Sequence, residues 1–187
     1  SSITIGNTSV NTVVNSTAVA LRQADFKPST PSTIGSWQEG RMYYDSEEKT
    51  IVVHGAGTSN VELTLGQREW VRCRNNSGAT IVKGNPTIAL ADASDGAKCQ
   101  VIGITGEDIA DGSHGYVIVR GYIEGLDTSA LTSGETVHLG YASPGDLVTV
   151  APTYPNYPFE IGTCLSSNST VGTLYVNLLN QTFDQFR

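Results

Sequence analysis

The residues whose types and spacing could support catalysis are three carboxylates close together in the sequence, Glu107, Asp108 and Asp111. Glycosidases use two carboxyl groups on opposite sides of the scissile bond, one as acid and one as nucleophile or base. Sugar sites usually also contain aromatic platforms; Trp37 and Trp70 are distant in sequence but could converge in the fold. We interpret the carboxylates as an acidic turn after an apolar strand, and a glycan-cleaving site is the alternative.

A serine directly before a histidine, Ser113 and His114 between two glycines, is the second candidate for catalysis. A hydrolytic serine needs a histidine that takes its proton and a third group that orients the histidine. Neighbouring residues in an extended stretch point to opposite sides, and the sequence has no Gly-x-Ser-x-Gly nucleophile elbow. We therefore interpret the pair as a turn between strands, and we predict no catalytic residues and no enzymatic activity.

Metal and cofactor binding are not predicted either. Residues 92–96 are similar to the first part of a calcium loop but lack the closing Glu of an EF-hand, so we expect a turn there. The three histidines, His54, His114 and His138, are not at ligand spacing. The cysteines form no close pair, and we expect them to be small buried or half-buried hydrophobic residues; they are Cys73, Cys99 and Cys164. No Walker loop and no Gly-x-Gly-x-x-Gly motif is present.

The charge pattern argues against nucleic acid as a partner. The 187-residue chain has a formal net charge of −7, and its 11 Lys and Arg are scattered rather than gathered into the basic stripe that phosphate binding requires. No stretch of 18 apolar residues occurs, so we predict no membrane partner. Only 16% of the residues are charged, and such a surface favours packing against other proteins.

Short runs of Val, Ile, Thr and Tyr between turn residues predict an all-β main domain over residues 67–179, an antiparallel β-sandwich or barrel. The predicted strands are 69–74, 79–82, 86–90, 99–105, 115–123, 135–139, 147–150, 159–165 and 172–179. Five loop glycines are expected to supply the positive φ of tight turns: Gly78, Gly84, Gly112, Gly134 and Gly145.

Upstream of this domain, residues 41–66 read as a β-hairpin region, with a further alternating strand at 61–65. Residues 25–40 hold prolines and glycines among Ser and Thr and read as a linker. Residues 180–187 are expected to form a C-terminal tail. A hairpin alone is marginal in water, so this one must pack on something.

Residues 1–24 are predicted to form an extended N-terminal arm, whose first 21 residues carry no charge. An isolated strand of this kind has nothing to bury against, so we expect it to be ordered by pairing with another chain. A proline-stiffened loop near residue 155 is the second expected interface, because Tyr is a good interface anchor. The interface residues that we predict are Val10, Val13, Val14, Val19, Tyr154 and Tyr157.

Residues 70–86, WVRCRNNSGATIVKGNP, resemble a module found in phage virion proteins. The similarity covers roughly residues 67–179 and continues through 101–105, 107–109, 115–121, 126–129, 134–139, 143–147 and 161–164. Residues 39–45, EGRMYYD, are similar to segments of phage fibre and virion-surface proteins. The resemblance rests on strands and turns and transfers no catalytic residue.

The resemblance implies a bacteriophage structural protein that assembles as a homo-oligomer, a trimer by expectation. The short chain favours a capsid decoration or cement protein, which clamps the major capsid protein or other virion proteins by surface contacts and by strand addition through the arm. The alternative is a tail-fibre or fibre-adaptor module that binds a host receptor or glycan. Either protein would be assembled in the cytoplasm of the host bacterium and would lie on the outer surface of the virion.

Overall fold

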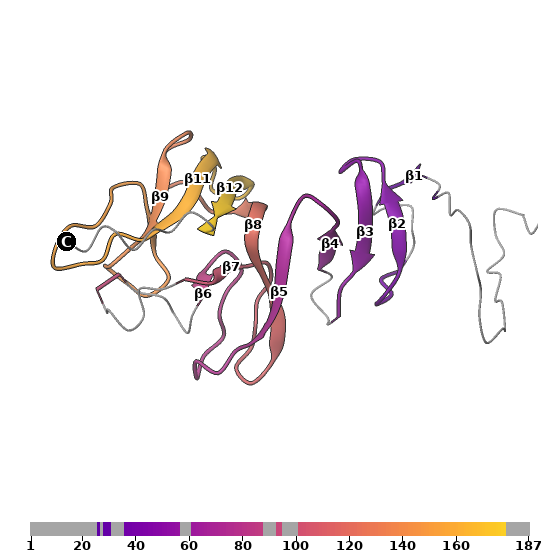
Figure 1. Cartoon of the computed structure of the whole chain (residues 1–187), viewed down its shortest axis with the longest axis horizontal. Helices are drawn as coiled ribbons and strands as arrows, with labels where there is room; N and C mark the ends of the chain where they lie inside the picture. The colour runs from indigo at the N-terminus through magenta and orange to yellow at the C-terminus, as the bar shows by residue number, and fades with distance from the viewer. Residues whose placement is uncertain are drawn as a thin grey trace, which may run out of the picture.

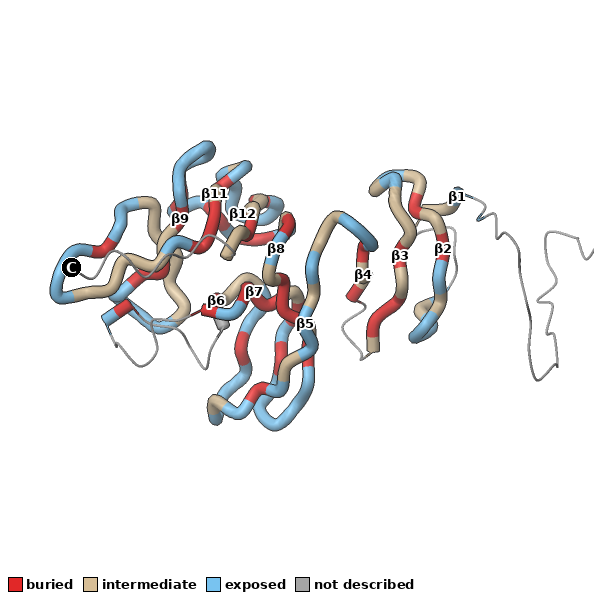
Figure 2. Tube along the Cα trace, viewed as in Figure 1, coloured by how far each residue is buried: buried red, intermediate tan, exposed pale blue. Residues whose placement is uncertain are grey.

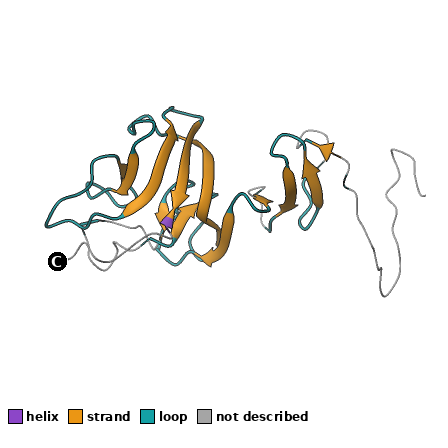
Figure 3. Ribbon diagram, turned by 45° about the horizontal axis from the view of Figure 1, so that its top comes forward, coloured by secondary structure: helices purple, strands orange, loops and turns teal. Residues whose placement is uncertain are grey.

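The computed structural model describes residues 26, 28–30, 36–56, 61–87, 93–94 and 101–178. Over these residues the chain is all-β, and its strands form a small sheet and a main sheet. Figure 1 shows the small sheet beside the start of the main sheet, and Figure 3 shows the strands in the same two groups. The predicted all-β class is confirmed. The predicted arm, with Val10, Val13, Val14 and Val19, and the predicted tail lie outside the described residues.

The small sheet has the strand order β1-β2-β3-β4. The predicted hairpin is present as two antiparallel strands joined by the polar turn at 46–49, and a third antiparallel strand follows where 61–65 was expected. A two-residue strand inside the predicted linker pairs in parallel with the hairpin. The four strands are β1 (Pro28–Ser29), β2 (Met42–Asp45), β3 (Thr50–His54) and β4 (Glu62–Thr64).

The main sheet runs in the order β10-β9-β11-β12-β8-β7-β6, and β5 also pairs with β8. Its strands are β5 (Glu69–Arg74), β6 (Pro86–Thr87), β7 (Gly103–Thr105), β8 (His114–Leu126), β9 (Thr136–Leu139), β10 (Leu147–Val148), β11 (Glu160–Ser166) and β12 (Gly172–Asn177). Most predicted strands are therefore found. The expected strand at 79–82 is only an isolated bridge between Ile81 and Ile109.

The main sheet curls around its own core. Val117 and Ile118 of β8 pair with both β5 and β7, so these two strands lie on opposite edges of β8. The two ends of the sheet approach each other, because a Cβ on Gly145, before β10, would lie 2.9 Å from Asn85, before β6. The sheet is thus close to a barrel in form.

Alternating side chains fill this curl. In β12 the buried side chains are Leu174 and Val176, and their neighbours are half-buried, as expected for a strand with one face on a core. The buried cluster gathers from β7, β8, β9, β11 and β12, with Ile104, Ile118, Val137, Leu139, Ile161 and Cys164 among its members. Figure 2 marks the buried stretches of these strands along the chain.

Tight turns join the strands where glycines were expected. All five predicted loop glycines have a φ between 75° and 89°. Such a conformation is accessible to glycine at little cost and strained for other residues. The prediction from their positions between strand runs is confirmed.

Hydrogen bonds join the small sheet to β8. The Tyr122 hydroxyl of β8 donates to the Glu48 carboxylate in the β2–β3 turn, and the Gln67 side-chain amide donates to the Glu48 carbonyl at 2.6 Å. Further along β8, the Tyr116 hydroxyl accepts the Ala56 amide at 3.0 Å. Two tyrosines of one strand therefore fix the position of the small sheet.

Gly121 and Gly134 allow a matched test of backbone packing. Both have positive φ, but a Cβ on Gly121 would lie 2.5 Å from the Gln67 carbonyl oxygen, whereas one on Gly134 meets nothing within 4 Å. We expect Gly134→Ala to lower the free energy of unfolding by about 1–2 kcal/mol through backbone strain alone. Gly121→Ala should cost about 1–3 kcal/mol more because it also forces β8 away from the residues before β5. Urea unfolding followed by tryptophan fluorescence measures both, and equal losses would contradict this account.

Candidate functional site

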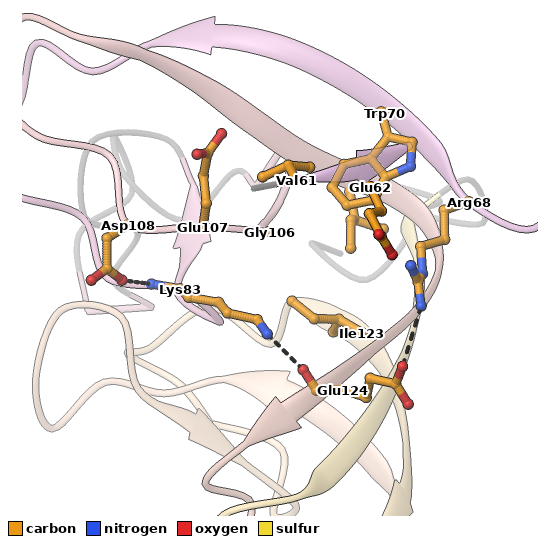
Figure 4. A pocket seen from close by; sticks show the side chains of 11 residues that line it. Val61, Glu62, Arg68, Trp70, Lys83, Gly106, Glu107, Asp108, Ile123 and Glu124 are labelled. Carbon is orange, nitrogen blue, oxygen red and sulfur yellow. Dashed lines mark hydrogen bonds and ion pairs between the residues drawn. The ribbon is translucent and has the colours of Figure 1, made fainter. Parts of the chain in front are cut away.

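A pocket of about 410 Å³ lies where the small sheet meets the main sheet. Figure 4 shows side chains from β4, β5, β8 and the connections after Ile81 and after β7 around it. Its lining mixes charged groups with apolar ones: Val61, Glu62, Arg68, Trp70, Lys83, Gly106, Glu107, Asp108, Ile118, Ile123 and Glu124. The pocket thus contains two of the three carboxylates singled out in the sequence.

The three predicted carboxylates lie in the turn-rich connection between β7 and β8, as expected. Each accepts a hydrogen bond from a backbone amide: Glu107 from Tyr116 at 2.9 Å, Asp108 from Lys83 at 2.8 Å, and Asp111 from Gly78 at 2.9 Å. Charge-assisted bonds of this kind hold loops in place. Their geometry gives the three carboxylates a structural role in anchoring neighbouring segments.

One of the two tryptophans joins the carboxylates, and the other does not. Trp70 lines the pocket, with its ring against Gly106 and edge-to-face with Tyr116 at 6.3 Å between ring centroids. A Cβ on Gly106 would lie 2.5 Å from the Trp70 ring, so the glycine permits this approach. Trp37 instead stacks on His54 in the small sheet at 3.8 Å.

The charged groups of the pocket are largely paired. The Arg68 guanidinium lies over the Tyr122 ring at 4.0 Å and 3.6 Å from the Glu124 carboxylate. The Lys83 ammonium donates to the Glu124 carbonyl at 2.8 Å, and burial lowers the pKa of Lys83. Because these groups hold one another in place, the pocket offers a preorganised set of donors and acceptors rather than a free acid and base.

A buried tyrosine continues this network into the small sheet. The Tyr43 hydroxyl donates to Glu62, which lines the pocket, at 2.9 Å. Burial, and next the hydrogen bond to Glu62, raises the pKa of Tyr43. The hydroxyl therefore stays protonated and keeps the Glu62 side chain in place.

The sequence contained no signal for four of the six charged residues of this pocket. Glu62, Arg68, Lys83 and Glu124 are spread over 63 positions of the chain (124 minus 62, counted inclusively) and share no motif. They meet because β4 adjoins the main sheet and β8 crosses it. The register of β8 against β5 and β12 places Glu124 at the pocket.

The remaining catalytic candidates do not converge. Ser113 and His114 are both exposed, and the Ser113 amide closes a turn by donating to the Ala110 carbonyl at 3.1 Å. His54 is buried in the small sheet, and His138 is half-buried in β9, where desolvation lowers the pKa of its imidazole. Cys164 is buried and Cys73 half-buried, as predicted, and Cys99 lies outside the described residues.

The predicted aromatic loop forms a second surface. Tyr154 is 96% exposed and Val150 is 80% exposed, and Tyr157 is half-buried, with its amide bonded to the Ala93 carbonyl at 2.8 Å. Beside the loop lies a groove of about 420 Å³ without any charged side chain, lined by Ala130, Tyr141, Leu147, Val148, Thr149, Val150, Ala151, Pro152 and Thr153. Exposed aromatic and aliphatic groups next to such a groove are typical of a protein contact surface.

The chain matches no protein-family model, no curated protein and no solved structure. Within the described part of the chain, no helix has the length and apolar character needed to cross a membrane. The same residues contain no group of three or more His, Cys, Asp or Glu side chains that could hold a metal ion. Function therefore has to be argued from the pocket, the loop and the sheets.

Glu107 provides a test of the structural role of the acidic turn. Glu107→Ala leaves the Tyr116 amide without its partner in a buried site, and we expect a loss of about 1–3 kcal/mol in the free energy of unfolding. Glu107→Gln keeps an acceptor oxygen and should lose less. The exposed Glu135→Ala serves as control. Unchanged stability of Glu107→Ala in thermal and urea unfolding would show that this carboxylate is not an anchor.

Proposed function

We propose that this chain is a structural subunit of a bacteriophage particle, a homo-oligomeric capsid decoration protein that acts through surface contacts and without catalysis. The observation that carries this proposal is the uncharged contact surface formed by the exposed Tyr154 loop and the groove beside it. Residues 147–159 contain no charged side chain, in a chain with net charge −7. The resemblance of residues 67–179 to phage virion modules supports the same class.

The chemistry of the candidate pocket supports a role that does not involve catalysis. A general acid or base must be free to exchange a proton with a substrate. Glu107 and Asp108 are instead used to bond backbone amides. A decoration protein needs a rigid scaffold that presents contact surfaces, and anchored turns supply that rigidity.

Tyr154 is the residue through which this proposal is tested. We expect Tyr154→Ala to weaken binding to capsids that lack the protein by at least about tenfold, because an aromatic hot-spot anchor contributes about 2 kcal/mol or more. Folding should be unchanged, since the side chain is 96% exposed. Co-sedimentation with capsids measures the affinity, and Val171→Ala, at a residue 64% exposed, is the control. Equal binding by all three proteins would overturn the role of the loop.

A fibre module that binds a host glycan is the second candidate function. It is favoured by one observation: Trp70 lines the same pocket as Glu107, Asp108 and Glu124. Aromatic rings and carboxylates together recognise the faces and hydroxyls of sugars. In this hypothesis the fold is the same, and the partner is a host glycan instead of a capsid.

The glycan hypothesis is tested with the purified protein and polysaccharide extracted from the host surface. Binding should fall at least about tenfold in Glu124→Gln, which loses a charged acceptor of the pocket, because a hydrogen bond to a charged group contributes about 1.5–3 kcal/mol. Glu135→Gln, an exposed residue outside the pocket, is the matched control. Absence of any binding by the unmodified protein, together with binding to capsids, would leave the decoration role alone.

A further inference from the structure

The small sheet has one apolar face and one polar face. The registers of β2, β3 and β4 place Met42 opposite Val53, and Val53 opposite Leu63. Side chains alternate along a strand, and cross-strand partners point to the same side. We name the side that carries these residues the outer face; its members are Met42, Tyr44, Ile51, Val53, Leu63 and Leu65.

The opposite side, the inner face, is mostly polar and carries Tyr43, Asp45, Val52, His54, Glu62 and Thr64. It is nonetheless the buried one: Asp45, His54 and Thr64 are buried together with Val52. Its polar groups are partly satisfied internally, as where Asp45 accepts the Glu47 amide at 2.7 Å. The chain therefore buries the polar side of this sheet.

The outer face is left exposed or half-buried. Met42 and Leu65 are 48% and 50% exposed, and the other members are half-buried. A face without a single charged or amide side chain is costly to leave in water. Sheets with one solvated side normally place polar residues there. The small sheet does the reverse, which is the pattern of a face that is covered in an assembly.

We propose that the outer face of the small sheet packs against the outer face of a second copy of this chain. The composition favours a permanent partner, and the homo-oligomer of the proposed function provides one in a second copy of the chain. Exchangeable interfaces are about as polar as the rest of a surface, whereas permanent ones, homodimer interfaces among them, resemble a domain core cut in half. All six members of the outer face are apolar or aromatic and uncharged, so two copies meet without like-charge repulsion.

Packing by faces also agrees with the edges of the sheet. Its edge strands, β1 and β4, have two and three residues. Short edge strands offer few unpaired main-chain groups for adding a strand from another chain. Two sheets facing one another at the usual spacing of roughly 10 Å would interdigitate their side chains into a shared core. A two-fold axis makes such a face-to-face contact self-complementary between two copies.

This inference rests on the homo-oligomer of the proposed function and identifies its surface. The test uses the full chain and two variants at exposed members of the outer face, Met42→Glu and Leu65→Glu. The control is Leu165→Glu in β11, because Leu165 is 52% exposed and Leu65 is 50% exposed. Circular dichroism and thermal unfolding at low protein concentration establish that each variant is folded.

Analytical ultracentrifugation over a concentration series gives the result. We expect the unmodified protein and Leu165→Glu to sediment as the same oligomer. The oligomers of Met42→Glu and Leu65→Glu should dissociate at protein concentrations at least about tenfold higher than the concentration at which the unmodified oligomer dissociates. The reason is that a carboxylate buried without a partner is strongly unfavourable. An unmodified protein that is monomeric at every concentration overturns both this inference and the homo-oligomer.

Two further outcomes separate this inference from the proposed function. If the unmodified protein is an oligomer and both outer-face variants remain oligomeric, the interface lies elsewhere and only this inference fails. If deleting residues 1–24 converts a monomer into an oligomer, the chain's own N-terminal segment covers the outer face and a second copy does not. The inference is supported if Met42→Glu and Leu65→Glu dissociate while the unmodified protein and Leu165→Glu remain oligomeric.

Discussion

Main-chain hydrogen bonds along the 13 residues of β8 hold the rest of the structure in place. Its first half is paired with β5 and β7 on opposite edges, and its second half is paired with β12. The Tyr116 and Tyr122 hydroxyls extend from the same strand to the small sheet. A single long strand thereby sets the curvature of the main sheet, the position of the small sheet and the shape of the pocket between them.

Much of the fold could be predicted because strands and turns leave local signals. The alternation in β12 and the glycines at positive φ are decided by nearest neighbours in the chain. The hairpin of β2 and β3 was likewise visible from two β-rich runs around a polar turn. The predicted strand at 79–82 is reduced to one bridge between Ile81 and Ile109, because the next residues turn away and the Lys83 amide bonds to Asp108.

The candidate site was less predictable because it depends on long-range register. Glu107 and Asp108 were found from their clustering, but Arg68, Lys83 and Glu124 carry no local signal. Their meeting depends on where β8 crosses β5, which no short window of sequence specifies. The same limit applies to the small sheet, since the alternation of β2 shows that it has two faces but not which face is buried.

The inner face of the small sheet contains buried polar groups that lower the stability of that sheet. Two of its buried polar atoms, His54 Nε2 and Thr64 Oγ1, and the indole nitrogen of Trp37 stacked on His54 have no hydrogen-bond partner. A buried polar group without a partner costs about 1–3 kcal/mol. Full burial of a side chain such as Leu or Met contributes about 1.5–3 kcal/mol. Covering the outer face would therefore supply stabilisation of the same order as the inner face loses. If a second copy covers the outer face as proposed, the small sheet gains stability in the oligomer, and assembly would then add to the folding free energy of this part of the molecule.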